Sequence, residues 1–127
     1  MGNGQGFFVC NHCGNVAKLA VSKGGKLACC GDEMRELEPN TVDASQEKHL
    51  PAVERTDRGI KVKIGSVPHP MLEEHRIDFI FVKTERGGQR VNLGAGASPE
   101  AEFCFADDKP VEAYAYCNLH GIWKISV

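Results

Sequence analysis

The chain has 127 residues, which is enough for one ordinary domain or for a small module and a compact domain. Hydrophobic residues make up 42% of the sequence and charged residues 25%, as is typical of a soluble globular protein. The net charge is -2 and the basic residues form no stripe, which argues against nucleic acid or an anionic membrane as a partner.

The start of the chain, "MGNGQGFFVCNHC", has no basic region followed by an apolar core, so it predicts no secretory signal. No apolar run approaches the roughly 20 residues that a membrane span requires. We therefore expect a cytoplasmic protein whose thiols stay reduced. In that compartment, six cysteines and five histidines in a short chain favour metal ligation over a disulfide framework.

Residues 1–37 are predicted to form a small separate module. They contain four of the six cysteines, in the clusters "CNHC" and "CC". The segment between the clusters, residues 16–30, is expected to form a hairpin that turns at Gly24-Gly25. So short a module buries little apolar surface and requires a staple. The polar "EPNTVDASQ" that follows has the composition of a linker.

Residues 38–127 are predicted to form an all-β domain. Short alternating runs, "GIKVKIG", "HRIDFIFVK", "EAEFCFA", "VEAYAYC" and "GIWKISV", are separated by turn signals at residues 57–59, 86–88 and 107–110. Strands at this spacing predict an antiparallel β-sandwich. Cys104 falls on the strand face opposite Phe103 and Phe105, and we interpret it as a structural thiol.

Two of these strands are expected to direct a polar side chain inward. Alternation puts His75 on the apolar face of "HRIDFIFVK", where it begins the strand, and Cys117 on the apolar face of "VEAYAYC". The expected apolar partners are Ile77, Phe79 and Phe81 on the first strand, and Val111, Ala113 and Ala115 on the second. A buried imidazole or thiolate is costly unless it is paired or binds a metal.

The four cysteines of the module, Cys10, Cys13, Cys29 and Cys30, form a first candidate metal site. Four thiolates in a tetrahedron suit zinc or iron, and the spacing does not choose between a folding staple and a redox centre. The adjacent pair Cys29-Cys30 is unusual, because neighbouring side chains reach two corners of a tetrahedron only with strain. His12 is expected to be a surface residue.

A second candidate site combines Cys117 with His49, His69, His75 and His120. Prolines on both sides of His69 hold it extended, and the "PMLEE" segment has to fold, as in one helical turn, for the His69 and His75 rings to meet. Gly121 supplies the backbone freedom needed directly after His120.

The number of donors in the second site points to its chemistry. Zinc normally takes four ligands, whereas four imidazoles and one thiolate suit an ion such as iron that accepts a further ligand. An open position opposite a thiolate indicates redox chemistry on a small oxygen species. Glu47 is close enough in sequence to His49 to reach that position, and Lys48 adds a positive charge beside it. The backbone N–H groups of Leu119 and His120 are expected to hydrogen-bond the Cys117 sulfur.

With these residues assembled, the chain resembles the desulfoferrodoxins, the two-iron class of superoxide reductases. The resemblance rests on four motifs in the family's order, which together cover nearly the whole chain. They are the two cysteine pairs, "EKHLP" from Glu47 to Pro51, "HPMLEEH" from His69 to His75, and "CNLHGIW" from Cys117 to Trp123. The resemblance implies a desulforedoxin-like module followed by an immunoglobulin-like antiparallel β-sandwich.

The resemblance also implies two irons per chain, with zinc as a possible substitute in either site. The four thiolates would hold one iron, and four equatorial histidines with axial Cys117 would hold the other. Glu47 would cap the open position in the oxidised resting state, and Lys48 would attract superoxide and organise water. The implied reaction is one-electron reduction of superoxide to hydrogen peroxide, with a rubredoxin-like donor restoring the electron. Members of the family are commonly homodimers.

Two alternatives remain open at this point. In the first, Cys10, Cys13, Cys117 and His120 form a single site of a zinc-binding interaction module. That leaves the pair Cys29-Cys30 and three histidines without a role. In the second, the four-cysteine centre acts as a simple electron carrier, which would not need the five-donor site or Lys48.

Overall fold

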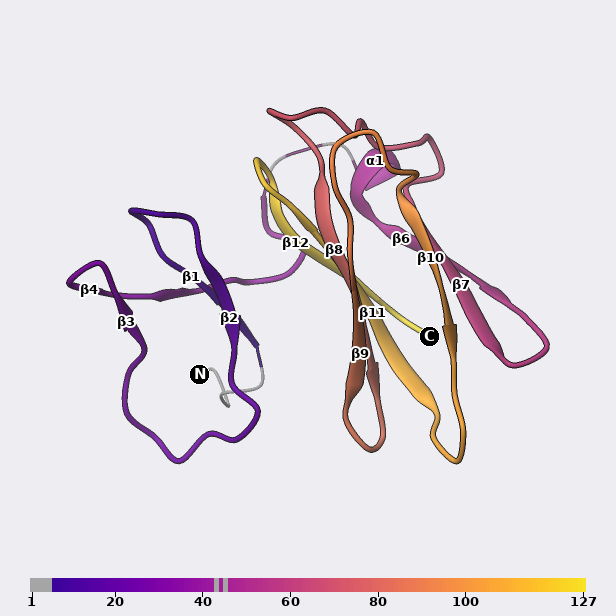
Figure 1. Cartoon of the computed structure of the whole chain (residues 1–127), viewed down its shortest axis with the longest axis horizontal. Coiled ribbons are helices and arrows are strands. Elements are labelled where there is room, and N and C mark those ends of the chain that lie inside the picture. The colour runs from indigo at the N-terminus through magenta and orange to yellow at the C-terminus, as the bar shows by residue number, and fades with distance from the viewer. Residues whose placement is uncertain (1–5, 43, 45) are drawn as a thin grey trace. The chain divides into compact units, whose positions relative to one another are not determined.

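The computed structural model describes residues 6–42, 44 and 46–127, and Figure 1 shows the course of the chain. The chain divides into two compact units, Met1–Glu38 and Pro39–Val127. No helix in the described part of the chain is long and apolar enough to cross a membrane.

The first unit consists of very short strands. Strand β1 (Phe7–Val9) pairs antiparallel with β2 (Val16–Lys18) and with β5 (Arg35–Glu36), while β3 (Ala28–Cys29) pairs with β4 (Asp32–Glu33). Its buried side chains are few: Phe7, Val9, Cys10, Met34 and Leu37. Such a small core contributes little hydrophobic stabilisation, which agrees with the expected need for a staple.

The hairpin predicted for residues 16–30 is wrong. The residues on either side of Gly24-Gly25 do not pair with each other; β2 pairs backward with β1, and β3 pairs forward with β4. The tight turns occur instead at the cysteine clusters, where Gly14 and Gly31 both take a φ of 81°. Glycine adopts this left-handed conformation without a steric penalty, so the metal-ligand turns also set the strand pairing.

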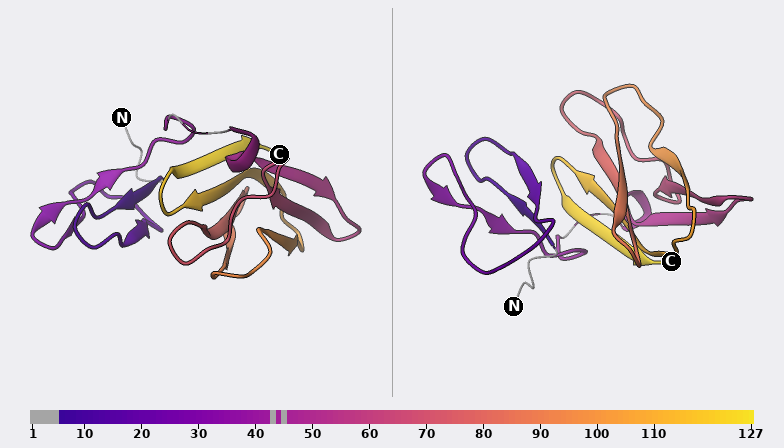
Figure 2. Two further views of the ribbon diagram at one scale, coloured as in Figure 1. Left: turned by 90° about the horizontal axis from the view of Figure 1, so that it is seen from above. Right: turned by 60° about the horizontal axis from the view of Figure 1, so that its bottom comes forward.

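The second unit is an antiparallel β-sandwich, as predicted. One sheet has the order β10-β7-β6, and the other has the order β12-β11-β8-β9. Figure 2 shows the two sheets facing each other within this unit. After the one-turn helix α1 (Gln46–His49), the strands are β6 (Pro51–Arg55), β7 (Gly59–Ile64), β8 (Ile77–Thr84), β9 (Gly88–Asn92), β10 (Glu100–Cys104), β11 (Pro110–Cys117) and β12 (Gly121–Ser126). The three predicted turn signals join β6 to β7, β8 to β9 and β10 to β11.

The core between the sheets follows the alternation of the sequence on most strands. On β7 the apolar residues face inward and the two lysines outward, as predicted. The core residues are Ile60, Val62, Ile64, Ile77, Ile80, Val82, Phe103, Ala113, Ala115 and Cys117. Burial of each large aliphatic side chain among them contributes about 1.5 to 3 kcal/mol. Cys117 therefore lies at the end of a well-packed apolar layer.

The predicted face of β8 is only partly right. Ile77 faces the core, but Ile80 and Val82 replace Phe79 and Phe81 on the inner face. The register against β11 shifts between the pairs Phe79–Tyr116 and Ile77–Cys117, so Asp78 is an extra residue in the ladder. A bulge of one residue moves every later side chain to the other face. On the outer face, the Phe79 ring stacks on Tyr116 at 5.6 Å.

Two further predictions need correction. Val111 is exposed, because the β11 ladder is irregular between Pro110 and Glu112 and the inward alternation begins only at Ala113. Cys104 lies on the face opposite buried Phe103, as expected, but its side chain is exposed, so it adds no packing to the core.

Candidate metal centres

The four cysteines of the first unit bring their sulfur atoms together. The thiols of Cys10, Cys13, Cys29 and Cys30 all lie within 4.8 Å of one another. The Cys13 and Cys29 sulfurs are 3.6 Å apart, and those of Cys29 and Cys30 are 3.9 Å apart. Four sulfurs bonded at about 2.3 Å to one tetrahedral ion are about 3.8 Å apart, so the group has the dimensions of a metal site.

The pKa values of these thiols also indicate that a cation would stabilise the group. Backbone N–H groups of Cys13 and His12 donate to the Cys10 sulfur and lower the pKa of this thiol to about 6. The neighbouring sulfurs of Cys13 and Cys10 raise the pKa of Cys29 to about 12. Four thiolates so close together repel one another, and a bound divalent ion removes that repulsion.

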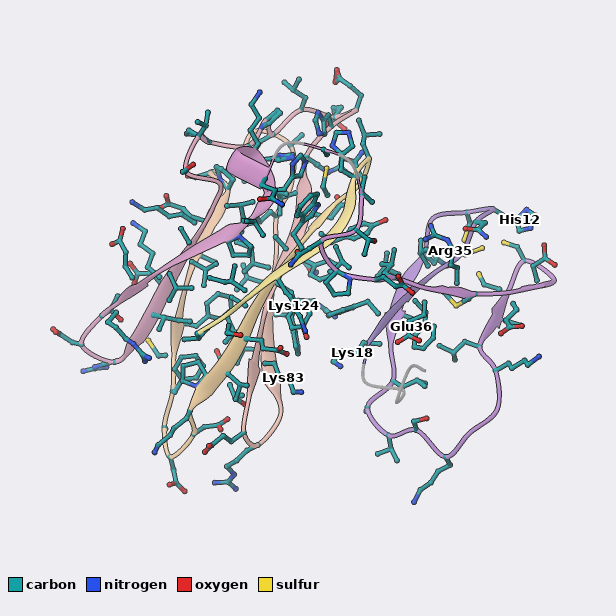
Figure 3. All side chains as sticks on the ribbon, turned by 180° about the vertical axis from the view of Figure 1, so that it is seen from behind. His12, Lys18, Arg35, Glu36, Lys83 and Lys124 are labelled. Carbon is teal, nitrogen blue, oxygen red and sulfur yellow. The ribbon has the colours of Figure 1, made fainter. Side chains whose placement is uncertain are left out.

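The adjacent cysteines are accommodated by a strained backbone. Cys30 has a φ of 54°, in the left-handed region that non-glycine residues rarely adopt. This conformation turns the Cys30 side chain toward the same point as that of Cys29, as the expectation of strain implied. His12 lies outside the thiol group, as predicted: its exposed ring is 2.6 Å from the Asp32 carboxylate. Figure 3 shows His12 beside the sulfur atoms.

In the second unit, four imidazole rings form a closed square. Neighbouring ring centroids are 4.7 Å apart for His49–His69, 4.8 Å for His69–His75, 5.1 Å for His75–His120 and 4.9 Å for His120–His49. Each neighbouring pair is close to perpendicular, at 73° to 86°. The diagonal pair His49–His75 is more widely separated, at 6.5 Å, and inclined at only 30°. The rings thus surround a common centre.

Cys117 and the imidazole nitrogens face that centre. Ligand atoms of His49, His69, His75 and Cys117 all lie within 4.8 Å of one another. His120 Nδ1 is 3.0 Å from His49 Nε2 and 3.8 Å from the Cys117 sulfur, so His120 joins the same group. Two nitrogens bonded at about 2.1 Å to one ion at right angles are about 3 Å apart, which matches the His49–His120 distance.

The His69 and His75 nitrogens have the protonation state that a metal ligand needs. His69 Nδ1–H donates to the Pro70 carbonyl at 2.7 Å, which leaves the lone pair on Nε2. The Nε2 atoms of His69 and His75 are buried and have no hydrogen-bond partner within the described part of the chain. Burial lowers the pKa of His69 to about 4 and also lowers that of His75, so both rings are neutral near pH 7. A bound cation would accept the lone pairs of these two buried nitrogens and so satisfy them.

Cys117 is fully buried, and two opposing effects act on the pKa of its thiol. Burial raises the pKa of this thiol, because a thiolate is poorly solvated there. The backbone N–H groups of Leu119 and His120 lower the pKa and partly offset that effect, in line with the predicted contacts. A thiolate in this place therefore needs a cation, and its charge is already shared with two peptide groups.

The group thus brings four imidazoles and one sulfur to a common centre, and comparisons with known proteins identify the family. The family model for desulfoferrodoxin matches residues 41–126. The chain belongs to the desulfoferrodoxin family. A desulfoferrodoxin of Nitratidesulfovibrio vulgaris is 44% identical over 124 residues, covering 98% of both chains. The crystal structure of the superoxide reductase from Treponema pallidum superposes with a TM-score of 0.80 at 38% identity, covering 95% of this chain and 98% of that one. A superoxide reductase of Pyrococcus abyssi is 33% identical and matches 67% of this chain.

The loops of this desulfoferrodoxin explain how distant residues reach one centre. The segment from His69 to His75 is folded, as required, but it is bent rather than helical: Leu72 and His75 exchange backbone hydrogen bonds of 2.9 and 3.3 Å. His75 precedes β8 instead of beginning it, because the strand starts at Ile77. Gly121 has a φ of 79°, which supports the predicted need for glycine after His120.

Of the two residues expected to act near the open position, the structure describes the side chain of Lys48. Lys48 is exposed on α1, and its positive charge is close enough to His75 to contribute to the lowered pKa of that ring. Glu47 lies on the same turn, but its side chain falls outside the described residues.

Two further residues at the site were not singled out by the sequence. The Trp123 ring stacks on His49 at 4.9 Å, and its Nε1–H donates to the His120 carbonyl at 3.1 Å. Asn118, directly after Cys117, binds the backbone on both sides of His75. The only signal for either was its place inside "CNLHGIW", since neither residue is itself a typical metal ligand.

Proposed function

We propose that this desulfoferrodoxin is a superoxide reductase that reduces superoxide by one electron, with two protons, to hydrogen peroxide. The observation that carries the proposal is the closed square of four imidazoles with the buried Cys117 sulfur among them. Five donors of this kind exceed the four of a zinc site and suit iron. The named superoxide reductases among the similar proteins support the same reaction.

Bound iron would supply the electron and a position at which a small oxygen ligand binds. The protein would do the rest. His49, His69, His75 and His120 would hold the ion through ring nitrogens, and Cys117 would hold it through its sulfur. The peptide N–H groups at Leu119 and His120 would draw charge from the sulfur. That withdrawal would moderate electron donation by the thiolate, which otherwise favours cleavage of an O–O bond.

Lys48 and Glu47 would control access to the open side. The exposed Lys48 ammonium would attract the superoxide anion and organise water for proton delivery, and its influence on His75 supports a place near the centre. The Glu47 carboxylate would cap the open position in the oxidised resting state.

The four thiolates of residues 1–37 would hold a second iron, and residues 38–127 would carry the reaction site. Zinc would be able to replace iron in either group during expression. We further propose a rubredoxin-like electron donor, a homodimeric assembly and a cytoplasmic location.

The mixed zinc site of the first alternative finds no support. Cys10 and Cys13 gather with Cys29 and Cys30, whereas Cys117 gathers with histidines, so each half already has its own partners. A simple electron carrier remains a distinct outcome of the test below.

The test combines metal analysis with a superoxide assay on aerobically purified protein. We expect two irons per chain and peroxide formation that depends on a supplied reductant. Iron only in the four-thiolate site without peroxide formation would indicate an electron carrier. Peroxide formation together with oxygen release and no need for a donor would indicate a dismutase, and either result would overturn the proposal.

A further inference from the structure

The Asn118 side chain links two segments of the histidine-cysteine site: the end of β11, which carries Cys117, and the loop that carries His75. Its Oδ1 accepts the Arg76 backbone N–H at 2.8 Å, and its Nδ2–H donates to the Glu74 carbonyl at 3.1 Å. Its own backbone N–H donates to the Arg76 carbonyl at 3.1 Å, which extends the ladder one step beyond the Ile77–Cys117 pair. One residue thus makes three hydrogen bonds to the segment that carries His75.

The two side-chain bonds have a specific geometric effect. The Glu74 carbonyl belongs to the peptide group before His75, and the Arg76 N–H belongs to the peptide group after it. One planar amide that binds both peptide groups restricts φ and ψ of the residue between them. The direction of the His75 ring follows from those two angles and from its own side-chain torsions.

His75 needs such support more than His49 or His69. Its loop neighbours Leu72, Glu73 and Glu74 are all exposed, and His75 itself is only half-buried. By contrast, His69 is fixed by flanking prolines and its bond to the Pro70 carbonyl, and His49 by the stacked Trp123. The three residues that precede His75 therefore give it little packing support.

We propose that Asn118 is a positioning residue that holds His75 in register with Cys117, so that the imidazole and the thiolate meet one metal ion. This inference rests on the proposed function only in treating both residues as ligands. Because Asn118 follows Cys117 directly, the same residue fixes the end of β11 and the loop before β8. Its loss is expected to loosen one corner of the square without removing any donor.

The chain offers a matched control at Asn40. The Asn40 side chain makes the same pair of bonds, accepting from the Lys124 N–H at 2.9 Å and donating to the Lys124 carbonyl at 3.1 Å, but at a residue that is not a ligand. Asn40 has a φ of 64°, so glycine replaces it without backbone strain. Asn40→Gly therefore removes an equal number of hydrogen bonds from the same unit.

The experiment uses the iron-loaded full chain and follows the thiolate-to-iron absorption of the oxidised second centre, assigned by its absence in Cys117→Ser. In Asn118→Ala we expect the band to shift and broaden, and the iron of this centre to pass to a chelator roughly 10- to 100-fold faster, as for other residues that orient metal ligands. Asn40→Gly should match the wild type in both respects, even if both variants lose equally in melting temperature.

If Asn118→Ala matches Asn40→Gly in band and in iron release, the positioning role is overturned. If the wild type shows no band that Cys117→Ser removes, the proposed function fails instead. Should Asn118→Ala not fold, Asn118→Asp makes the same comparison, because its carboxylate still accepts the Arg76 N–H but has no donor for the Glu74 carbonyl.

Discussion

The thiol group and the histidine-cysteine group have opposite relations to the fold around them. In the first unit, Cys13 and Cys30 are exposed, and of the four cysteines only Cys29 lies in a strand, the two-residue β3. In the second unit, Cys117, His49 and His69 are at most 3% exposed, at one end of a packed sandwich. The comparison predicts that the first unit depends on a bound metal to fold, whereas the second unit folds first and provides a site for the metal.

The largest expected effect comes from breaking the first group. Cys10→Ser should abolish folding of residues 6–38, because bound metal supplies most of the folding free energy of such small modules. The measurement is amide NMR, in which the dispersed signals of this unit should collapse while those of residues 46–127 persist. Cys104→Ser, at an exposed thiol outside both groups, should leave every signal in place. Loss of both units together in Cys10→Ser would contradict the distinction.

In the histidine-cysteine group, loss of a ligand is expected to impair the reaction while the fold survives. Cys117→Ser should lower the rate of superoxide reduction at least about a hundredfold, since it removes a ligand rather than a residue that orients one. The fold should survive, because serine fills nearly the same space and the apolar layer of Ile77, Ala113 and Ala115 remains. Pulse radiolysis gives the rate, and thermal unfolding of the metal-free protein gives the stability. A variant that keeps its visible band and its rate would show that Cys117 is not a ligand.

The sequence predicted the second unit better than the first, because packing of apolar side chains decides the structure of the second unit. Where packing decides the structure, as in the alternation of β7 and the inward Cys117, the pattern of apolar residues was enough. The one-residue bulge at Asp78 was missed because alternation in "HRIDFIFVK" is equally regular in either register. In the first unit the turns at the cysteines decide the pairing, and a Gly-Gly pair predicted a hairpin where none forms. Asn118 and Trp123 were missed as positioning residues because their roles depend on partners distant in sequence.

A smaller effect is expected from acid on the metal-free protein. His69 has a pKa of about 4 in the folded chain, below the ordinary value of 6.5, because burial disfavours its charged form. Between these two pH values the unfolded chain binds more protons than the folded chain. The free energy of unfolding therefore decreases as the pH falls from 6.5 toward 4. We expect a loss on the order of 2 kcal/mol from this group, measured by urea unfolding across that range. His69→Gln should flatten the dependence, and an equal slope in both proteins would disprove the assignment.

The smallest expected effect concerns the approach of the substrate to the second site. Lys48→Ala should slow the second-order reaction with superoxide by about tenfold at low ionic strength and weaken its salt dependence, because a positive charge near the site steers an anion. Lys26→Ala, which removes an equal charge from the first unit, should change neither quantity. Pulse radiolysis across a salt series distinguishes them, and identical curves for the two variants would remove the steering role.

The most direct test of the account is X-ray absorption at the iron edge on the Cys10→Ser protein, which should retain only the second centre. We predict one sulfur and four imidazole nitrogens around that iron, the donor set gathered by His49, His69, His75, His120 and Cys117. An iron surrounded by several sulfurs, or by none, would contradict the central claim that the imidazole square and Cys117 form one metal centre.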